Sequence, residues 1–179
     1  GTAPDALLDT YHAERHPVGA RVLMNTQAQG LLYLRGTEVE PLRELFAELM
    51  SYEKVNRHLA AMVSGLEIRY EGGADDHPLL GRRLPPRDLL VDGEPTDTQR
   101  LLRSARGVLI ARVGDPALRR KAEPWRERVD VVTASTRPDG EGLPGTRALL
   151  VRPDGYVAWT DPGREEPTEA LRRWFGAPH

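Results

Sequence analysis

The stretch "GVLIARVGDPALRRKAEPWRERVDVVTA", residues 107–134, carries the clearest signals of secondary structure in this chain. Its first seven residues, 107–113, form a continuous apolar run that predicts a buried strand. Asp115 followed by Pro116 is typical of a helix N-terminus, since aspartate caps the first turn and proline suits its first position. The apolar side of that helix consists of Leu118, Ala122 and Trp125. Residues 128–134 predict a second strand, so the stretch indicates a β-α-β unit.

The segment "RALLVRPDGYVAWT", residues 147–160, predicts a hairpin around Pro153, Asp154 and Gly155. A C-terminal helix should follow, with an apolar side of Leu171, Trp174 and Phe175 and an end at Gly176. A right-handed crossover makes the first two strands parallel, and the hairpin makes the last two antiparallel. Helices flanking such a mixed sheet, in the order β-α-β and then β-β-α, form a thioredoxin-like arrangement. The stretch after the first strand reads "VGDPAL" and lacks cysteine, so thiol redox chemistry is not expected.

Upstream of this domain, residues 1–70 are predicted to be helical. A long helix over residues 7–34 is expected to be interrupted at Pro17. Two further helices, "VEPLRELFAELM" and "KVNRHLAAMVSGL", each place their apolar residues on one side, which predicts one buried stripe per helix. The turn formers of "EGGADDHP", residues 71–78, indicate a boundary. The domains are therefore expected to be a helical segment, 1–70, and a thioredoxin-like domain, 71–179. Within the latter, Thr96 and Gln99 predict a capping box for a short helix.

Composition narrows the classes of function. The 179 residues include 25 basic and 27 acidic side chains, a net charge of −2 that creates no field for nucleic acid or an anionic membrane. Arginine clusters such as "LRRKAEPWRER" are interleaved with Glu123 and Glu127 and lack an aromatic series, so they favour solvated helix faces over nucleic-acid binding. There is no cysteine and no apolar run of membrane-spanning length. We expect a soluble, cytoplasmic protein.

Gly140, Gly142 and Gly145 form a literal G-x-G-x-x-G. Dinucleotide binding requires this loop to run from a strand directly into a helix, whose amides meet the pyrophosphate. Here the loop runs into the strand expected near Arg147, and Pro144 removes one amide. A loop without a cofactor is the better interpretation.

Two other sequence patterns do not indicate a metal-binding or catalytic site. His12 and His16 are four residues apart, but Glu14 is not at the position that zinc proteases require and no third ligand is indicated, so a solvated helix face is expected. No serine lies in a nucleophile motif, which leaves a hydrolase unsupported for Ser51, Ser64, Ser104 and Ser135. The sequence therefore predicts no catalytic, cofactor-binding or metal-binding residue.

Four segments taken together resemble a known family. They are "LLDTYHAERHPVGARVL", "LRELFAELMSYEKVNRHLAAMVSGLEIRY", "HPLLGRRLPPRDLL" and "ALLVRPDGYVAW". In this order they are similar to the C-terminal region of FAD-dependent aromatic hydroxylases that oxygenate polyketides, whose last third is a thioredoxin-like domain without its cysteines. In that family the segment resembling residues 7–18 follows the flavin-binding G-D motif, on helices that pack against the flavin and substrate domains.

The resemblance implies that the chain is the tail of such an enzyme, with a structural and domain-contact role. The family's N-terminal G-x-G-x-x-G, D-G and G-D motifs have no match here, so no flavin or catalytic residue carries over. FAD and NAD(P)H are implied for the parent enzyme and no cofactor for this chain, which alone should be inactive. The implied partners are the flavin and substrate domain and a possible second copy, with neither nucleic acid nor membrane. The alternative is a free-standing, redox-inactive thioredoxin-like module that binds a protein partner.

Overall fold

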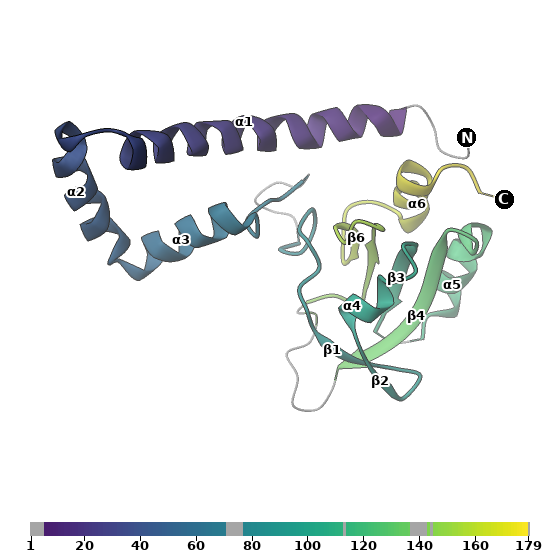
Figure 1. Cartoon of the computed structure of the whole chain (residues 1–179). Helices are drawn as coiled ribbons and strands as arrows, with labels where there is room; N and C mark the ends of the chain where they lie inside the picture. The colour runs from purple at the N-terminus through teal and green to yellow at the C-terminus, as the bar shows by residue number, and fades with distance from the viewer. Residues whose placement is uncertain (1–5, 71–76, 113, 137–142, 144, 179) are drawn as a thin grey trace. The chain divides into compact units, whose positions relative to one another are not determined.

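The computed structural model describes residues 6–70, 77–112, 114–136, 143 and 145–178. The chain divides into two compact units. The first, Leu8–Ile68, is helical, and the second contains Arg69–His179 and a mixed β-sheet with helices (Figure 1). We call them the helical unit and the sheet domain.

The sheet domain is built on six strands in the order β2-β1-β4-β3-β5-β6. Strands β3 and β4 are parallel, while β3 with β5, β5 with β6, β1 with β4 and β1 with β2 are antiparallel. The parallel pair and the final hairpin agree with the sequence prediction, and the domain is a mixed α/β fold of thioredoxin-like type. The strands are β1 Asp88–Val91, β2 Glu94–Asp97, β3 Gly107–Ala111, β4 Val129–Thr136, β5 Ala148–Val151 and β6 Val157–Asp161.

Both faces of this sheet are covered, because alternate residues of a strand point to opposite sides. On one side Leu109 of β3 packs in a cluster with α5 (Pro116–Ala122), the following 3-10 turn η2 (Glu123–Trp125) and α6 (Pro167–Phe175). On the other side Val108 and Ile110 pack in a second cluster that includes Leu143, with Leu101 of α4 (Thr98–Leu101) against it. All five residues of β3 are buried, as its apolar run predicts.

Local signals place the main elements of this domain. The carboxylate of Asp115 accepts the backbone N–H groups of Ala117 at 2.9 Å and Leu118 at 3.1 Å, which caps α5 as predicted. Gly155 has a φ of +86°, the left-handed conformation that the Pro-Asp-Gly turn requires. Gly176 ends α6 with a φ of +78°.

Two details of the sheet domain differ from the sequence prediction. Strands β1 and β2 were not expected, and they form a hairpin around Asp92 and Gly93, both with positive φ. The predicted capping box of Thr96 and Gln99 is wrong. Thr96 lies in β2, and the N-cap of α4 is Asp97, whose carboxylate accepts the Arg100 backbone N–H at 2.8 Å. Aspartate lies one residue closer to the helix and is an equally good capping acceptor.

The helical unit contains the three predicted helices, α1 (Ala6–Leu34), α2 (Glu40–Met50) and α3 (Glu53–Ser64), with a 3-10 turn η1 (Thr37–Val39) between the first two. The predicted interruption of the first helix is wrong, because α1 continues through Pro17. A proline inside a helix removes one hydrogen bond to the carbonyl four residues earlier. Pro17 is exposed, so water can solvate that carbonyl, and the helical residues on either side keep the helix continuous.

The apolar stripes of α2 and α3 are present but are not buried. No residue of either helix is buried within the part of the chain that the structure describes. The sequence prediction of one buried stripe per helix is therefore wrong for this chain, because periodicity identifies the apolar side of a helix and not what covers it. Across the described ranges, no helix is long and apolar enough to cross a membrane.

Candidate functional site

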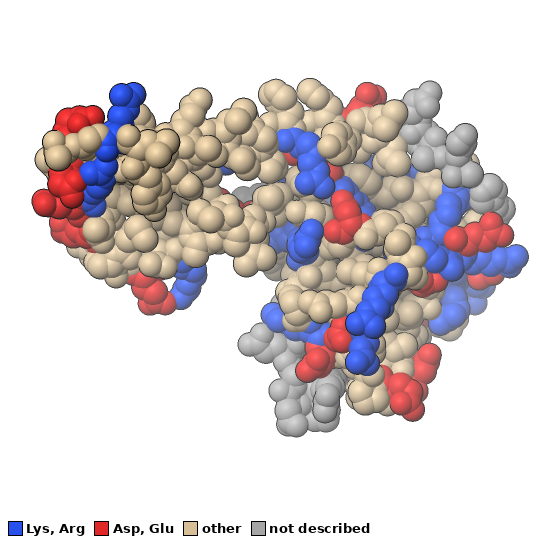
Figure 2. Space-filling view, viewed as in Figure 1, with Lys and Arg blue, Asp and Glu red and all other residues tan. Residues whose placement is uncertain are grey.

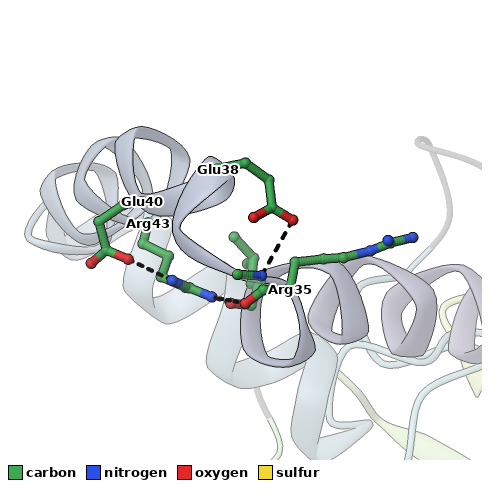
Figure 3. Close-up of polar contacts among 6 residues, drawn as sticks. Arg35, Glu38, Glu40 and Arg43 are labelled. Carbon is green, nitrogen blue, oxygen red and sulfur yellow. Dashed lines mark hydrogen bonds and ion pairs between the residues drawn. The ribbon is translucent and has the colours of Figure 1, made fainter.

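A polar corner joins α1 to α2 within the helical unit (Figure 3). The last carbonyl groups of a helix have no partner inside the helix. Arg43 of α2 supplies the missing donors, since its Nε donates to the carbonyl of Leu32 at 2.6 Å and its Nη2 to that of Arg35 at 2.7 Å. Its Nη1 also forms an ion pair with Glu40 at 2.5 Å, and the Glu38 carboxylate accepts a backbone N–H of the connecting turn at 3.2 Å. A cation at a helix C-terminus is also favoured by the helix dipole. These contacts fix the angle between α1 and α2.

The three helices held in this way enclose an apolar groove of about 460 Å³. Its described lining residues carry no charge, and three of them, Asn25, Gln29 and Asn56, are amides. The Asn56 amide donates to the carbonyl of Met50 at 3.3 Å, which holds the start of α3 against the end of α2. The other lining residues are Ala28, Leu32, Tyr33, Phe46, Met50, Leu59, Ala60, Met62 and Val63. A mostly apolar concavity of this size with a few polar groups is typical of a binding site.

Exposed apolar side chains continue beyond the groove over the helical unit. Among the described residues, all of the strongly exposed large apolar side chains lie between positions 8 and 66, and none lies in the sheet domain. Tyr33 is 79% exposed and Leu34 is 85% exposed, values that a buried helix side would not show. Figure 2, which has the same view as Figure 1, shows mostly uncharged surface over α1 and α3. An apolar surface of this extent marks an interaction site.

A second cavity, of about 750 Å³, lies at the carboxyl end of β3 in the sheet domain. This is where a thioredoxin places its dithiol, and here Gly114, Asp115 and Pro116 line it. The rim carries an ion pair between Arg147 and Asp161 at 2.7 Å. The hydrogen bond and the charge of Asp161 raise the pKa of the Arg147 guanidinium above its ordinary value. The described lining includes no histidine or cysteine, so neither a thiol nor an imidazole base is available there.

This strand-to-helix junction does not fit the pyrophosphate of a flavin. Such a site needs free backbone N–H groups at the helix N-terminus. Pro116 has no N–H, and the amides of Ala117 and Leu118 already donate to the Asp115 carboxylate. That carboxylate would also repel a phosphate. We therefore assign no flavin contact to this junction.

The motifs singled out in the sequence do not come together in a site. Gly140 and Gly142 lie outside the described residues, and Gly145, with a φ of +72°, precedes strand β5 rather than a helix. The rings of His12 and His16 are 5.1 Å apart on α1. Over the described ranges, no three ligating side chains form a group that could hold a metal ion.

The serines and arginines mostly have structural contacts. Ser51 and Ser64 donate to carbonyl groups of their own helices, and Ser104 donates to Asp130 at 3.1 Å. Ser135 lines the cavity at the end of β3 without a histidine beside it in the described lining. Several arginines are in ion pairs, among them Arg100 with Asp97, Arg106 with Asp130 and, from the cluster named above, Arg126 with Glu123.

Sequence reasoning did not identify the groove. The sequence does place apolar residues on more than one side of α1, because Leu23, Met24 and Leu34 lie on a different side of the helix from Val18 and Val22. These five residues do not line the groove itself. A helix with apolar residues around most of its circumference is normally covered on several sides. All five side chains are at least partly exposed here.

The sheet order, the parallel β3/β4 pair and the missing thiols define a cysteine-free domain of thioredoxin type. Residues 77–178 match the family described as aromatic-ring hydroxylase, C-terminal, and the chain belongs to that family.

Relatives and solved structures are similar over nearly the whole chain. The 12-dehydrotetracycline 5-monooxygenase/anhydrotetracycline 6-monooxygenase of Streptomyces rimosus is 46% identical over 99% of this chain, and a rifampicin monooxygenase of Streptomyces venezuelae is 41% identical over 99%. CabE, an aromatic hydroxylase from angucycline biosynthesis, superimposes with a TM-score of 0.93 at 55% identity over 100% of the chain. The chain spans 36%, 34% and 37% of the respective lengths of these three proteins, about one third.

Proposed function

We propose that this chain is the C-terminal part of an FAD-dependent aromatic-ring hydroxylase of the polyketide monooxygenase type. In this proposal it has a structural and domain-contact role and contributes no catalytic apparatus of its own. The observation that carries the proposal is the distribution of exposed apolar surface. The described sheet domain has a closed core on both faces of its sheet, whereas the helical unit leaves its apolar stripes uncovered. A domain-sized partner is the simplest cover for such a surface.

The partner in this proposal is the flavin and substrate domain of the same enzyme. The relatives' additional two thirds leave ample chain length for such a domain. FAD and NAD(P)H would be bound there, as the resemblance to FAD-dependent hydroxylases implies, and the junction of β3 and α5 in this chain does not suit a pyrophosphate. We further propose that a second copy of the chain can occupy part of the exposed surface, and that the protein is cytoplasmic, in keeping with its lack of cysteine.

The experiment that tests the proposal begins with the intact mass of the natural protein and its encoded reading frame. We expect a longer frame in which a strand followed by G-x-G-x-x-G and a helix precedes this chain. The full-length product should be yellow with about one FAD per chain, whereas the 179-residue chain purified alone should be colourless. Stoichiometric flavin in the isolated chain would contradict the domain-contact role.

The alternative is a free-standing, redox-inactive thioredoxin-like module that binds a protein partner through the helical unit. It has the same exposed surface as its support. A natural protein whose mass equals that of this chain would favour the alternative and refute the proposed function.

A further inference from the structure

The groove of the helical unit has properties that restrict what it can bind. Its described lining is uncharged, so it offers no charged partner to a phosphate, a carboxylate or an ammonium group. A charge taken into it would lose hydration that the few neutral polar groups of the lining replace only in part. The occupant must therefore present an uncharged and mainly apolar surface.

Hydrogen bonds between the helices connect the elements that line the groove. Arg43 ties the end of α1 to α2, and Asn56 ties α3 to the last residue of α2. A site held open by hydrogen bonds loses little conformational entropy when it is filled. About 460 Å³ is enough for two or three large apolar side chains.

Two observations favour a polypeptide as the occupant. Exposed apolar side chains such as Leu31, Leu45 and Leu49 continue the apolar surface beyond the groove, over an area that a small molecule would leave uncovered. Asn25 and Gln29 both line the groove four residues apart on α1, about 6 Å along the helix axis. Two residues of an extended chain span about 6.6 Å, which is close to the separation of Asn25 and Gln29. The side-chain amides of these two residues can therefore form hydrogen bonds with main-chain groups two residues apart on one extended segment.

A longer chain is a better occupant than a second copy. Apolar residues lie around much of the second half of α1, and one two-fold contact between copies would cover only one of its sides. The relatives are about three times as long as this chain. The additional polypeptide of such a protein can contact several sides of α1 at once. We propose that the groove seats an apolar, uncharged segment of the polypeptide that these relatives have and this chain does not span. This inference rests on the proposed function and assigns a contact surface to it.

Cysteine labelling tests this proposal directly, because the chain has no cysteine of its own. Ala60 lines the groove and is exposed, so Ala60→Cys adds a small thiol without filling the cavity. Ser104→Cys is the matched control, since Ser104 is exposed in the sheet domain and is not among the residues that line the groove. Each variant is made in the 179-residue chain and in the full-length product of the reading frame. Maleimide labelling at each position is followed by peptide mass spectrometry at low protein concentration.

In the isolated chain, both thiols should react at similar rates. In the full-length product, labelling at position 60 should slow at least tenfold while labelling at position 104 stays unchanged. Equal labelling at position 60 in both proteins would show an open groove and overturn this inference, while a yellow full-length product would leave the proposed function intact. Protection of position 60 in the isolated chain that increases with concentration would identify a second copy as the occupant and also overturn it. A reading frame without an upstream domain would refute the proposed function itself.

Discussion

Replacing Gly155 by valine should destabilise the sheet domain through the backbone alone. Gly155 has a φ of +86°, and its N–H donates to the carbonyl of Arg152 at 2.9 Å while its own carbonyl accepts the N–H of Leu84 at 2.8 Å. These two bonds hold the turn in place. A Cβ atom added at position 155 would lie 3.7 Å from Leu102 Cδ1, an ordinary contact, so no collision contributes. The cost is that of a β-branched residue in a left-handed conformation, about 1–3 kcal/mol.

Tryptophan fluorescence during urea or thermal unfolding is the assay for this variant. All three tryptophans, Trp125, Trp159 and Trp174, lie in the sheet domain, so their signal reports that domain and not the helical unit. Each kcal/mol lost should lower the midpoint of thermal unfolding by about 4–8 °C for a domain of this size. Gly155→Asn is the matched control and should lose less, because asparagine tolerates positive φ. A valine variant that unfolds with the parent would refute the turn assignment.

Three further predictions use the same chain. Gly107→Ala should destabilise the sheet domain by about 1–3 kcal/mol in the same fluorescence assay, since the added Cβ would lie 2.3 Å from the ring of Phe175; an unchanged midpoint would contradict this packing. Arg152→Lys should lower the midpoint, because the Arg152 guanidinium lies 4.1 Å from the centre of the Trp174 ring and lysine cannot reproduce its planar stacking; full retention of stability would exclude that role. The isolated chain should self-associate along the first half of α1, with a sedimentation coefficient that rises with concentration and falls back in a Leu8→Glu variant; a monomer at all concentrations would exclude this contact.

The sheet domain was largely predictable because its main signals are local. Asp115 and Pro116 mark the start of α5 within two residues, and the Pro-Asp-Gly turn defines the β5/β6 hairpin within three. The β1/β2 hairpin was not predicted, although its Asp92-Gly93 turn is a strong hairpin signal. Its strands are only four residues long, and Pro95 argues against a central strand. Proline is acceptable there because β2 is at the edge of the sheet.

The candidate site was less predictable for a different reason. The spacing within α2 identifies Leu42, Leu45 and Leu49 as one side of a helix. Whether these side chains are exposed depends on whether another part of a polypeptide covers them, which the spacing does not encode. The Arg43 contact with the carbonyl groups of Leu32 and Arg35 joins residues eight and eleven positions apart across a turn. No repeat in the sequence encodes a contact of that kind, and the groove it helps to form became visible only in the structure.

The strand order has a consequence for how fast the two parts of the chain fold. In the centre of the sheet Val108 pairs with Val151 and Leu89 pairs with Thr136, and each pair joins residues more than forty positions apart. The chain entropy lost in closing loops of that length opposes strand pairing until the strands meet, so the sheet domain should fold more slowly than the helices form. The helices of the helical unit depend on contacts between near neighbours and should form in about a microsecond. Newly made protein should therefore pass through an interval in which formed helices present their apolar sides before the sheet is complete.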